Sequence, residues 1–527
     1  MDTQVPNSFV NKKIVWTIIG FAICLRVLLL LCLHTDLNCD EAMLGLNANC
    51  IANKGTDIFG ASFPVYFEGW VVSGQSSLPT MMVAIFIKIF GNNLLAIKLP
   101  LMLISIVGLV YLYRLCKLMF DEKIAFIILC LATINPWLLL QQSISLDCNY
   151  FPHIFIIALF YLYKGITKNK ELLIYLSMVI FGLSLYCYGV AIFVIPLFLL
   201  LVCVMALKRE DISVKTAMIT MIVFIFIACP IIRFYVVNAL KQEGVKYFNL
   251  LSIQRFYYQR RSDDLIFFSK NPFVQLFKNA FFAIWVSFVQ SDKLPWNYIT
   301  GFGTMYALPF IVFFPFGIKK IFKDKNYYLI SYSICSAFLG LIVNGININR
   351  INYIWYLFII INGVGILEVI NKVKWENTKK VIMGIYALVF VLFIICFFTI
   401  YPKNVNNSFT VSKGLYEACN YIEDKQYKNI GVSKACMDND AEYVFMLYAL
   451  ADGFDGNLSR QRFIEIDMNL DDEDFCWLGE KINISSDISK LDNEDVYLIL
   501  DNEYTDEYKN KYSCIKFNKY YVLIKNS

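Results

Sequence analysis

Long apolar runs separated by short polar connections occupy the first 400 residues of the chain. About 20 consecutive apolar residues form a helix long enough to cross the hydrocarbon core of a bilayer. The pattern therefore predicts a polytopic membrane domain of about eleven transmembrane helices. The runs lie at 14–33, 98–117, 123–141, 150–164, 172–187, 189–207, 214–233, 302–318, 327–343, 351–368 and 380–400.

Lysine and arginine gather in alternate connections, such as KGITKNKE (164–171) and NKVKWENTKK (371–380). Because basic connections stay on the cytoplasmic side, the pattern predicts a cytoplasmic N-terminus in the plasma membrane. The first run follows Lys12 and Lys13 and lacks a small-residue cleavage site, so we expect a retained signal anchor. The apolar run 77–90 is too short for an untilted span, and we expect a surface or re-entrant helix there.

This topology puts five polar segments on the extracytoplasmic face. They are the first loop (34–97), the turn around Asp147, the loop 234–300, the turn ending at Arg350 and the tail. The tail becomes polar at residue 401, and its alternation of strand-like and helix-like segments predicts a separate α/β domain over 401–527. The predicted fold is an all-α membrane domain over 1–400 followed by this extracytoplasmic α/β domain.

Composition supports this assignment, since hydrophobic residues make up 58% of the chain, charged residues 17%, and the mean hydropathy is +0.56. The net charge of +5 comes mostly from short loops, so we expect no nucleic-acid partner. Most of the 16 cysteines lie in apolar runs and favour packing. Those of the tail could form disulfides if the tail is outside, and their spacing leaves the pairing open: Cys419, Cys436, Cys476 and Cys514.

Three acidic residues, Asp36, Asp40 and Glu41, follow the first span in HTDLNCDEAMLGLNANC. We expect a helix from Asp40 and Glu41 to Gly55, lying on the bilayer as an amphipathic segment. Helix capping would explain one acid but does not need the adjacent pair. A carboxylate at the lipid surface could instead serve as a general base for a hydroxyl whose reaction partner arrives on a lipid.

The first loop also carries a recognisable order of residues, DEAMLGLNANCIANKGTDIFGASFPVYFEGWVVSGQSSLP (40–79), followed by a short apolar helix and IKLP. It resembles the first-loop signature of the GT-C superfamily of membrane glycosyltransferases. The similarity is greatest to bacterial members related to protein O-mannosyltransferases and to the lipid A aminoarabinose transferase. Weaker matches extend it to residue 400: INPWLLLQQSISLDCNYFP (134–152), LSLYCYGVAIFVIPL (183–197) and NINRINYIWYLFIIINGVGI (347–366).

The resemblance implies transfer of a sugar, hexosyl or pentosyl, from a polyprenyl phosphate to an acceptor hydroxyl. It places the key carboxylate at Asp40, with Glu41 completing the pair and Asp147 as a second acidic position, whereas Asp36 has no counterpart. Tyr66, Glu68 and Gln75 are expected to contact the acceptor or the loop. Similar sequences carry an arginine just before Asp147, where this chain reads Gln142, Ser143 and Ile144. The activity either uses another residue there or is altered.

A departing polyprenyl phosphate gains negative charge and needs cations beside it. Arg350 lies at an outer helix end, where similar sequences have an arginine, and is the first candidate for the phosphate. The stretch KQEGVKYFNLLSIQRFYYQRRSDD adds basic residues interleaved with aromatic ones, which suit a donor phosphate or lipid headgroups equally: Lys246, Arg255, Arg260 and Arg261.

A metal site is weakly indicated. His34 and His153 lie on distant segments and suit packing at helix ends. A divalent cation bridging Asp40, Asp147 or Glu68 to the phosphate is a possible cofactor, since some GT-C enzymes use one. Asp438 and Asp440 have the DxD spacing of nucleotide-sugar sites, but in an acidic domain this is more often chance or a helix cap.

The sequence thus predicts an inverting membrane glycosyltransferase with Asp40 as general base and a glycan, lipid or protein as acceptor. Two alternatives stay open: a lipid or sugar transporter, and a non-catalytic member that binds polyprenyl lipid. Transporter sites tend to lie at broken helices near the bilayer midplane, whereas these carboxylates cluster at one interface. An oligosaccharyltransferase is disfavoured because the chain has no WWD motif.

Overall fold

The computed structural model describes residues 11–32, 37–69, 74–248, 250–256, 265–373, 375–406, 410–411, 413–437, 475–477, 482–485 and 494–526. The chain divides into two compact units, each assembled from separate segments. Unit 1 comprises residues 1–33, 100–235 and 260–404, and unit 2 comprises 34–99, 236–259 and 405–527.

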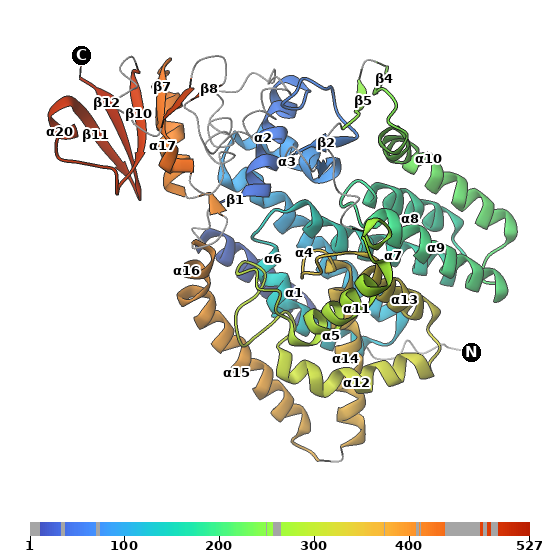
Figure 1. The fold of residues 1–527 in the computed structure, drawn as a ribbon. Helices are drawn as coiled ribbons and strands as arrows, with labels where there is room; N and C mark the ends of the chain where they lie inside the picture. Colours follow the sequence, from blue (N-terminus) through green and yellow to red (C-terminus); the bar gives the residue numbers. More distant parts are fainter. Residues whose placement is uncertain are drawn as a thin grey trace. The chain divides into compact units, whose positions relative to one another are not determined.

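Unit 1 is helical, and its helices are labelled in Figure 1. They are α1 (Lys12–Cys32), α4 (Leu94–Met119, which begins in unit 2), α5 (Glu122–Thr133), α6 (Pro136–Gln141), α7 (Asp147–Thr167), α8 (Glu171–Ser184), α9 (Ala191–Lys208), α10 (Val214–Ala239, which ends in unit 2), α11 (Pro272–Val289), α12 (Ala307–Lys323), α13 (Tyr327–Ile342), α14 (Trp355–Lys372), α15 (Thr378–Thr399) and α16 (Tyr401–Asn406, which ends in unit 2). Short 3-10 turns lie at Ile266–Phe268 and Asn352–Ile354.

Among the described residues, eight helices are long and apolar enough to cross a membrane, and three shorter apolar helices accompany them. The chain is therefore a multi-pass membrane protein, as the hydropathy pattern predicts. The number eleven for the spans stays a prediction. The run 77–90 forms one of the shorter helices, α3 (Ser77–Phe90).

The prediction of a loop over residues 234–300 was wrong in one part, because residues Pro272–Val289 form the apolar helix α11. Its polar residues Gln275, Lys278 and Asn279 lower the hydropathy of the run, which hid the helix in the sequence.

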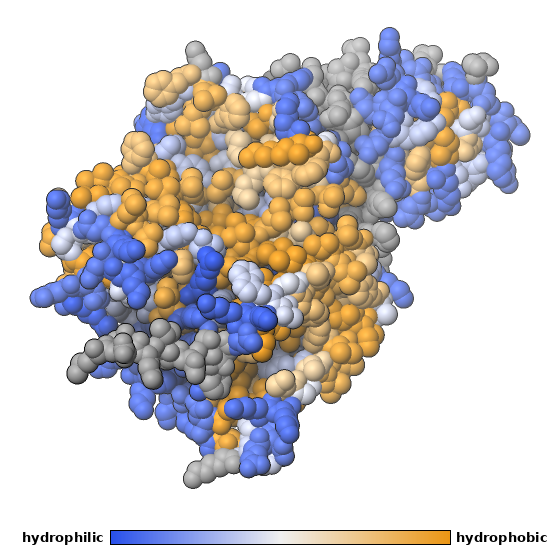
Figure 2. Space-filling view, turned by 180° about the vertical axis from the view of Figure 1, so that it is seen from behind, coloured by the Kyte–Doolittle hydropathy of each residue, from blue (hydrophilic) through white to orange (hydrophobic). Residues whose placement is uncertain are grey.

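The core of unit 1 forms around α7 and α14. In the most apolar stretch of each of these helices, 72% of the residues are buried, compared with 22% in the peripheral helix α15. Two glycines let α12 and α14 approach closely. A Cβ at Gly317 would lie 1.9 Å from the carbonyl oxygen of Ile361, and one at Gly365 would lie 2.0 Å from that of Phe313. On the outside, hydrophobic residues form a wide surface over the helices in Figure 2, as a bilayer requires.

Unit 2 joins first-loop and tail elements. The first loop supplies β1 (Leu37–Asn38), α2 (Cys39–Lys54), α3 and the antiparallel hairpin of β2 (Tyr66–Glu68) and β3 (Gly74–Ser76). Residues 236–259 add a second antiparallel hairpin, β4 (Val245–Tyr247) and β5 (Leu251–Ile253). At the start of the tail, β6 (Thr410–Val411) pairs antiparallel with β1, with Leu37 opposite Val411.

The rest of the tail forms a six-stranded mixed sheet with the order β11-β12-β10-β7-β9-β8. Its elements are α17 (Lys413–Asp424), β7 (Ile430–Ser433), a 3-10 turn (Lys434–Met437), β8 (Phe475–Trp477), β9 (Ile482–Ser485), β10 (Val496–Leu500), α20 (Tyr508–Lys511), β11 (Tyr512–Phe517) and β12 (Tyr520–Lys525). Strands β10, β7 and β9 are parallel, and α17 packs against β11 and β12. The predicted β-containing tail is confirmed. One hydrophobic core contains residues of both the first loop and the tail.

Of the tail cysteines, Cys419 and Cys514 are thiols. Burial raises the pKa of Cys419 to about 12, so its thiol stays uncharged.

Candidate functional site

The N-terminus of α2 shows how the two neighbouring first-loop acids differ. Asn38 is the N-cap, and its side-chain oxygen accepts a hydrogen bond of 2.9 Å from the backbone N–H of Asp40. The backbone N–H of Asn38 donates in return to Glu41 Oε2 at 2.8 Å, which completes a capping box. Glu41 therefore caps and stabilises the N-terminus of α2. At the other end, α2 stops at Gly55, as predicted, with φ of +71°.

Glu41 is also half of a buried ion pair. Lys98 Nζ lies 3.0 Å and 3.1 Å from its two carboxylate oxygens, and the side chains of Lys98 and Glu41 are only 5% and 1% exposed. Two charges with so little water depend on each other, because removal of one leaves the other buried without compensation. No motif in the sequence points to Lys98, although its place at the start of an apolar run is unusual for a lysine.

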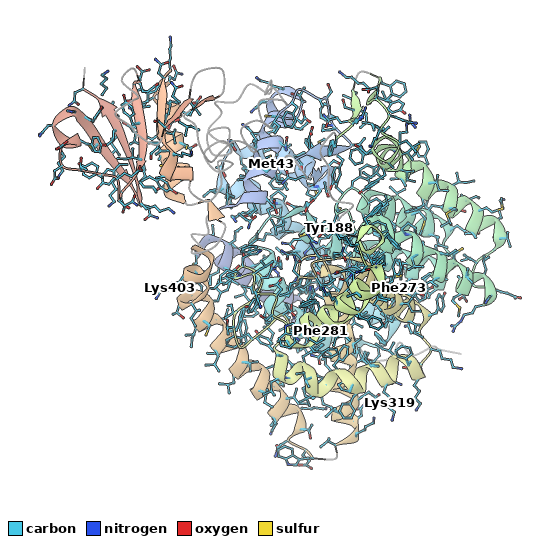
Figure 3. The ribbon with its side chains drawn as sticks, viewed as in Figure 1. Met43, Tyr188, Phe273, Phe281, Lys319 and Lys403 are labelled. Carbon is cyan, nitrogen blue, oxygen red and sulfur yellow. The ribbon has the colours of Figure 1, made fainter. Side chains whose placement is uncertain are left out.

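Asp40 itself is exposed. Its backbone carbonyl accepts a hydrogen bond of 2.8 Å from Gln75 Nε2, so the hairpin holds the residue that carries the carboxylate. The residues from Glu41 to Ile51 are all buried, which leaves α2 no apolar face to lie on a bilayer. The predicted surface-lying helix is in this respect wrong. Met43 of this buried stretch is labelled in Figure 3.

The β2–β3 hairpin contains the other predicted loop contacts. Tyr66, Glu68 and Gln75 are each buried, between 4% and 5% exposed. The hydroxyl of Tyr66 donates to the carbonyl oxygen of Gly74 at 3.2 Å. Gly74 is required by its surroundings, since a Cβ there would lie 2.5 Å from Tyr66 Cε1 and 2.7 Å from the carbonyl oxygen of Phe67. These residues support the loop, and an acceptor contact for them stays a prediction.

The basic segment after α10 docks on the first loop within unit 2. Gln254 Nε2 donates to Asp57 Oδ2 at 3.0 Å, and Asp57 Oδ1 accepts the backbone N–H groups of Phe59 and Ala61 at 2.9 and 2.8 Å. The backbone N–H of Val65 donates to the carbonyl oxygen of Ser252 at 2.9 Å.

Of the predicted cations of this segment, Lys246 is exposed, and Arg255 pairs with Glu243 at 3.0 Å. Arg260 and Arg261 lie outside the described residues, as do His34, Asp36, Asp438 and Asp440.

In unit 1 the structure brings the segments of Asp147 and Arg350 together. Asp147 is the first residue of α7, and the carbonyl oxygen of the next residue, Cys148, accepts a hydrogen bond of 2.5 Å from Asn352 Nδ2. Arg350 Nη1 donates to the carbonyl oxygen of Asn344 at 2.5 Å, so its guanidinium braces its own turn. Tyr188, labelled in Figure 3, packs against the small apolar cluster that includes Cys148.

The positions where similar sequences carry an arginine are closed. Gln142, Ser143 and Ile144 are buried; Gln142 accepts a hydrogen bond from Ser105 at 3.4 Å, and Ser143 donates to the carbonyl oxygen of Leu140 at 2.6 Å. These three residues of the turn therefore lie in the protein interior.

In the described part of the chain, no three His, Cys, Asp or Glu side chains come together. His153 is buried, with Nδ1 2.7 Å from the hydroxyl of Tyr356 and its ring stacked on Trp137. Its surroundings are those of a packed residue, as the sequence favours.

Comparison with known structures identifies the fold. The crystal structure of ArnT from Cupriavidus metallidurans bound to undecaprenyl phosphate matches this fold with a TM-score of 0.56. The match covers 98% of each chain, and the two sequences are 12% identical. The archaeal oligosaccharyltransferase AglB from Archaeoglobus fulgidus, in complex with an inhibitory peptide and a dolichol-phosphate, is 14% identical, with a TM-score of 0.50. That match covers 84% of this chain and 64% of AglB. The chain has a GT-C fold.

Sequence comparison agrees with this GT-C assignment. The family model for dolichyl-phosphate-mannose-protein mannosyltransferase matches residues 76–234. No curated protein matches the sequence. A further structure of the A. fulgidus oligosaccharyltransferase, in complex with Zn and sulfate, is 14% identical with a TM-score of 0.51. This chain spans 61% to 64% of the length of these two oligosaccharyltransferase structures. The resemblance read from the first loop is confirmed, and the relatives are glycosyltransferases.

Proposed function

We propose that this GT-C protein transfers a sugar from a polyprenyl phosphate to an acceptor hydroxyl at the extracytoplasmic face, with inversion. The observation that carries the proposal is the division of labour at the start of α2. Glu41 is buried in a capping box and an ion pair, whereas Asp40 is exposed on a backbone fixed by Asn38 and Gln75. An exposed carboxylate on a rigid element suits a general base.

In the proposed step the acceptor oxygen attacks the anomeric carbon while the bond from that carbon to the phosphate oxygen breaks. The hydroxyl proton passes to the Asp40 carboxylate, and the polyprenyl phosphate leaves with the bonding electron pair. We assign the charge of the leaving phosphate to Arg350 and the cations after α10, because a guanidinium matches phosphate oxygens in geometry and charge. Asp147 is proposed to orient the sugar or the acceptor beside them.

The fold of the solved relatives supports the donor class. The ArnT structure has undecaprenyl phosphate bound, and the AglB structure is a complex with a dolichol-phosphate. We infer that this chain takes a donor of the same chemistry.

Asp40→Asn tests the assignment directly. Mass spectrometry of co-purifying lipids identifies the donor, and release of polyprenyl phosphate from it measures turnover. General-base catalysis contributes about 10²- to 10⁴-fold, so we expect turnover to fall by at least about 10²-fold. Binding of undecaprenyl phosphate should stay within about twofold, because the base acts on the acceptor.

The matched control is Asp324→Asn, an exposed carboxylate paired with Lys320, which should leave turnover unchanged. Near wild-type turnover in D40N would remove Asp40 from the mechanism. A wild-type protein that binds undecaprenyl phosphate but shows no turnover on any co-purifying lipid would favour the non-catalytic alternative.

A further inference from the structure

A third carboxylate, Asp292, lies between the two predicted site segments of unit 1. It follows α11, in the connection to α12. Its Oδ1 accepts the backbone N–H of Leu294 at 3.0 Å, and its Oδ2 accepts Asn297 Nδ2 at 2.7 Å and the backbone N–H of Ile348 at 2.8 Å. Three N–H donors hold this carboxylate in one orientation.

One series of hydrogen bonds connects Asp292 to the turn of Asp147. Asn297 is fully buried, and its Oδ1 accepts a hydrogen bond of 3.1 Å from Gln141 Nε2. The carbonyl oxygen of Gln141 accepts in turn from Asn149 Nδ2 at 3.3 Å. Asn149 stands two residues after Asp147 in the first turn of α7. Three successive hydrogen bonds therefore connect Asp292 to the backbone that carries Asp147.

A second connection runs from Asp292 to the turn of Arg350. Ile348 is held on both sides, since its N–H donates to Asp292 and its carbonyl oxygen accepts from Trp355 Nε1 at 3.1 Å. Arg350 is two residues further on, and its backbone N–H donates to Asn347 Oδ1 at 2.7 Å. Fixing Ile348 thus fixes the start of the turn that carries Arg350.

We propose that Asp292 is a positioning residue that sets Arg350, and with it Asp147, for a polyprenyl phosphate. This inference rests on the function proposed above and adds a residue that neither the motifs nor the family resemblance indicate. Asp292 acts through Arg350 and touches no substrate. Its side chain must be an acceptor at both oxygens, because all three of its partners are N–H donors. An asparagine would turn an NH₂ group toward at least one of them.

The surroundings of Asp292 fit this role. Burial raises the pKa of Asp292 above its ordinary value, while the hydrogen bonds from Ile348, Leu294 and Asn297 act in the opposite direction. A carboxylate that served only to keep a loop soluble would be exposed to water, whereas Asp292 is largely buried against three N–H donors. Leu294 and Asn297 belong to the same connection as Asp292, whereas Ile348 belongs to the turn before Arg350, so the carboxylate fixes one connection against the other.

The test measures binding of undecaprenyl phosphate to the full-length protein in nanodiscs, for Asp292→Asn, Arg350→Ala and the double variant. We expect D292N to weaken binding about tenfold, and to change it less than about twofold in the R350A background, because its effect passes through Arg350. Asp292→Glu keeps two acceptor oxygens and should recover part of the loss. Asp324→Asn is the control and should bind as wild type.

Each outcome bears on a different claim. Equal binding by wild type and D292N, or a loss that is as large in the R350A background, would overturn the positioning role and leave the proposed function intact. A wild-type protein without measurable binding would overturn the proposed function itself. If D292N does not fold, Asn297→Ser removes one donor without touching the charge. That variant loosens the Asp292 carboxylate that holds Ile348, and it should therefore weaken binding about threefold where Arg350 is present. Unchanged binding would count against the proposal.

Discussion

At the scale of single residues, adjacent acids in the sequence have different environments. The sequence presents Asp40 and Glu41 as one pair, and capping accounts for only one of them. The structure shows that Glu41 is the capping residue, together with Asn38, and that Lys98 neutralises it. The chemical hypothesis consequently narrows to Asp40. Which partner a buried acid finds depends on a residue 57 positions away, and no local pattern contains that information.

The ion pair makes a prediction about stability. Lys98→Met leaves Glu41 buried without its cation and should lower the free energy of unfolding by about 3–5 kcal/mol. The double variant K98M/E41Q should recover much of this loss, since glutamine can still close the capping box. Unfolding in mixed micelles measures both variants.

Lys320→Met is the matched control, because the Lys320–Asp324 pair is 34% and 40% exposed. Water and salt screen such a pair, so its loss should cost less than about 1 kcal/mol. If K98M were as mild as K320M, the buried pair would contribute little and the fixed start of α2 would need another explanation.

At the scale of elements, the β2–β3 hairpin connects packing to the site. Gly74 lets β3 pass against Tyr66, and the next residue, Gln75, holds the backbone of Asp40. A side chain at residue 74 would push β3 away and take Gln75 with it.

Gly74→Ala should therefore destabilise the protein by about 1–3 kcal/mol and lower turnover. Gly384→Ala in α15 is the control: a Cβ there meets nothing within 4 Å, and alanine favours a helix over glycine by about 0.5–1 kcal/mol. Thermal unfolding and turnover are measured on both. Equal behaviour of the two variants would contradict the packing argument.

Helix α11 bears on topology. Its 18 residues would extend about 27 Å, close to a membrane span. Yet Leu265 before it bridges Val343, and Asp292 after it accepts the N–H of Ile348, so both flanks meet the same connection between α13 and α14. We predict that α11 returns to the side it starts from. The basic connections then keep the cytoplasmic placement that the sequence indicates.

Cysteines at positions 270 and 293, introduced by Lys270→Cys and Lys293→Cys, test this in a background whose exposed native cysteines are serine. Both lysines are exposed. A membrane-impermeant thiol reagent applied outside intact cells should label both. Labelling of only one would mean that α11 crosses the membrane and that the later connections change side.

At the scale of the whole molecule, the sequence predicts the helical membrane part, the β-containing tail and the GT-C resemblance, because hydropathy and motif order are local properties. It also groups Asp147 with Arg350, and the contact between Asn352 and Cys148 agrees with that grouping. It misses Lys98, Asp292 and α11, whose roles arise from contacts across long separations in the chain. The boundary at 401 stays a prediction, and the structure adds that the tail shares a core with the first loop.

The pairing of β1 with β6 has a consequence for biosynthesis. Leu37 and Asn38 are synthesised hundreds of residues before their partners Thr410 and Val411. At about 5–20 residues per second, the segment before Asp40 waits tens of seconds for its partner strand. The core that supports α2 is likewise incomplete until the tail is made. A nascent chain therefore holds its first loop incompletely packed until the residues of the tail have been synthesised.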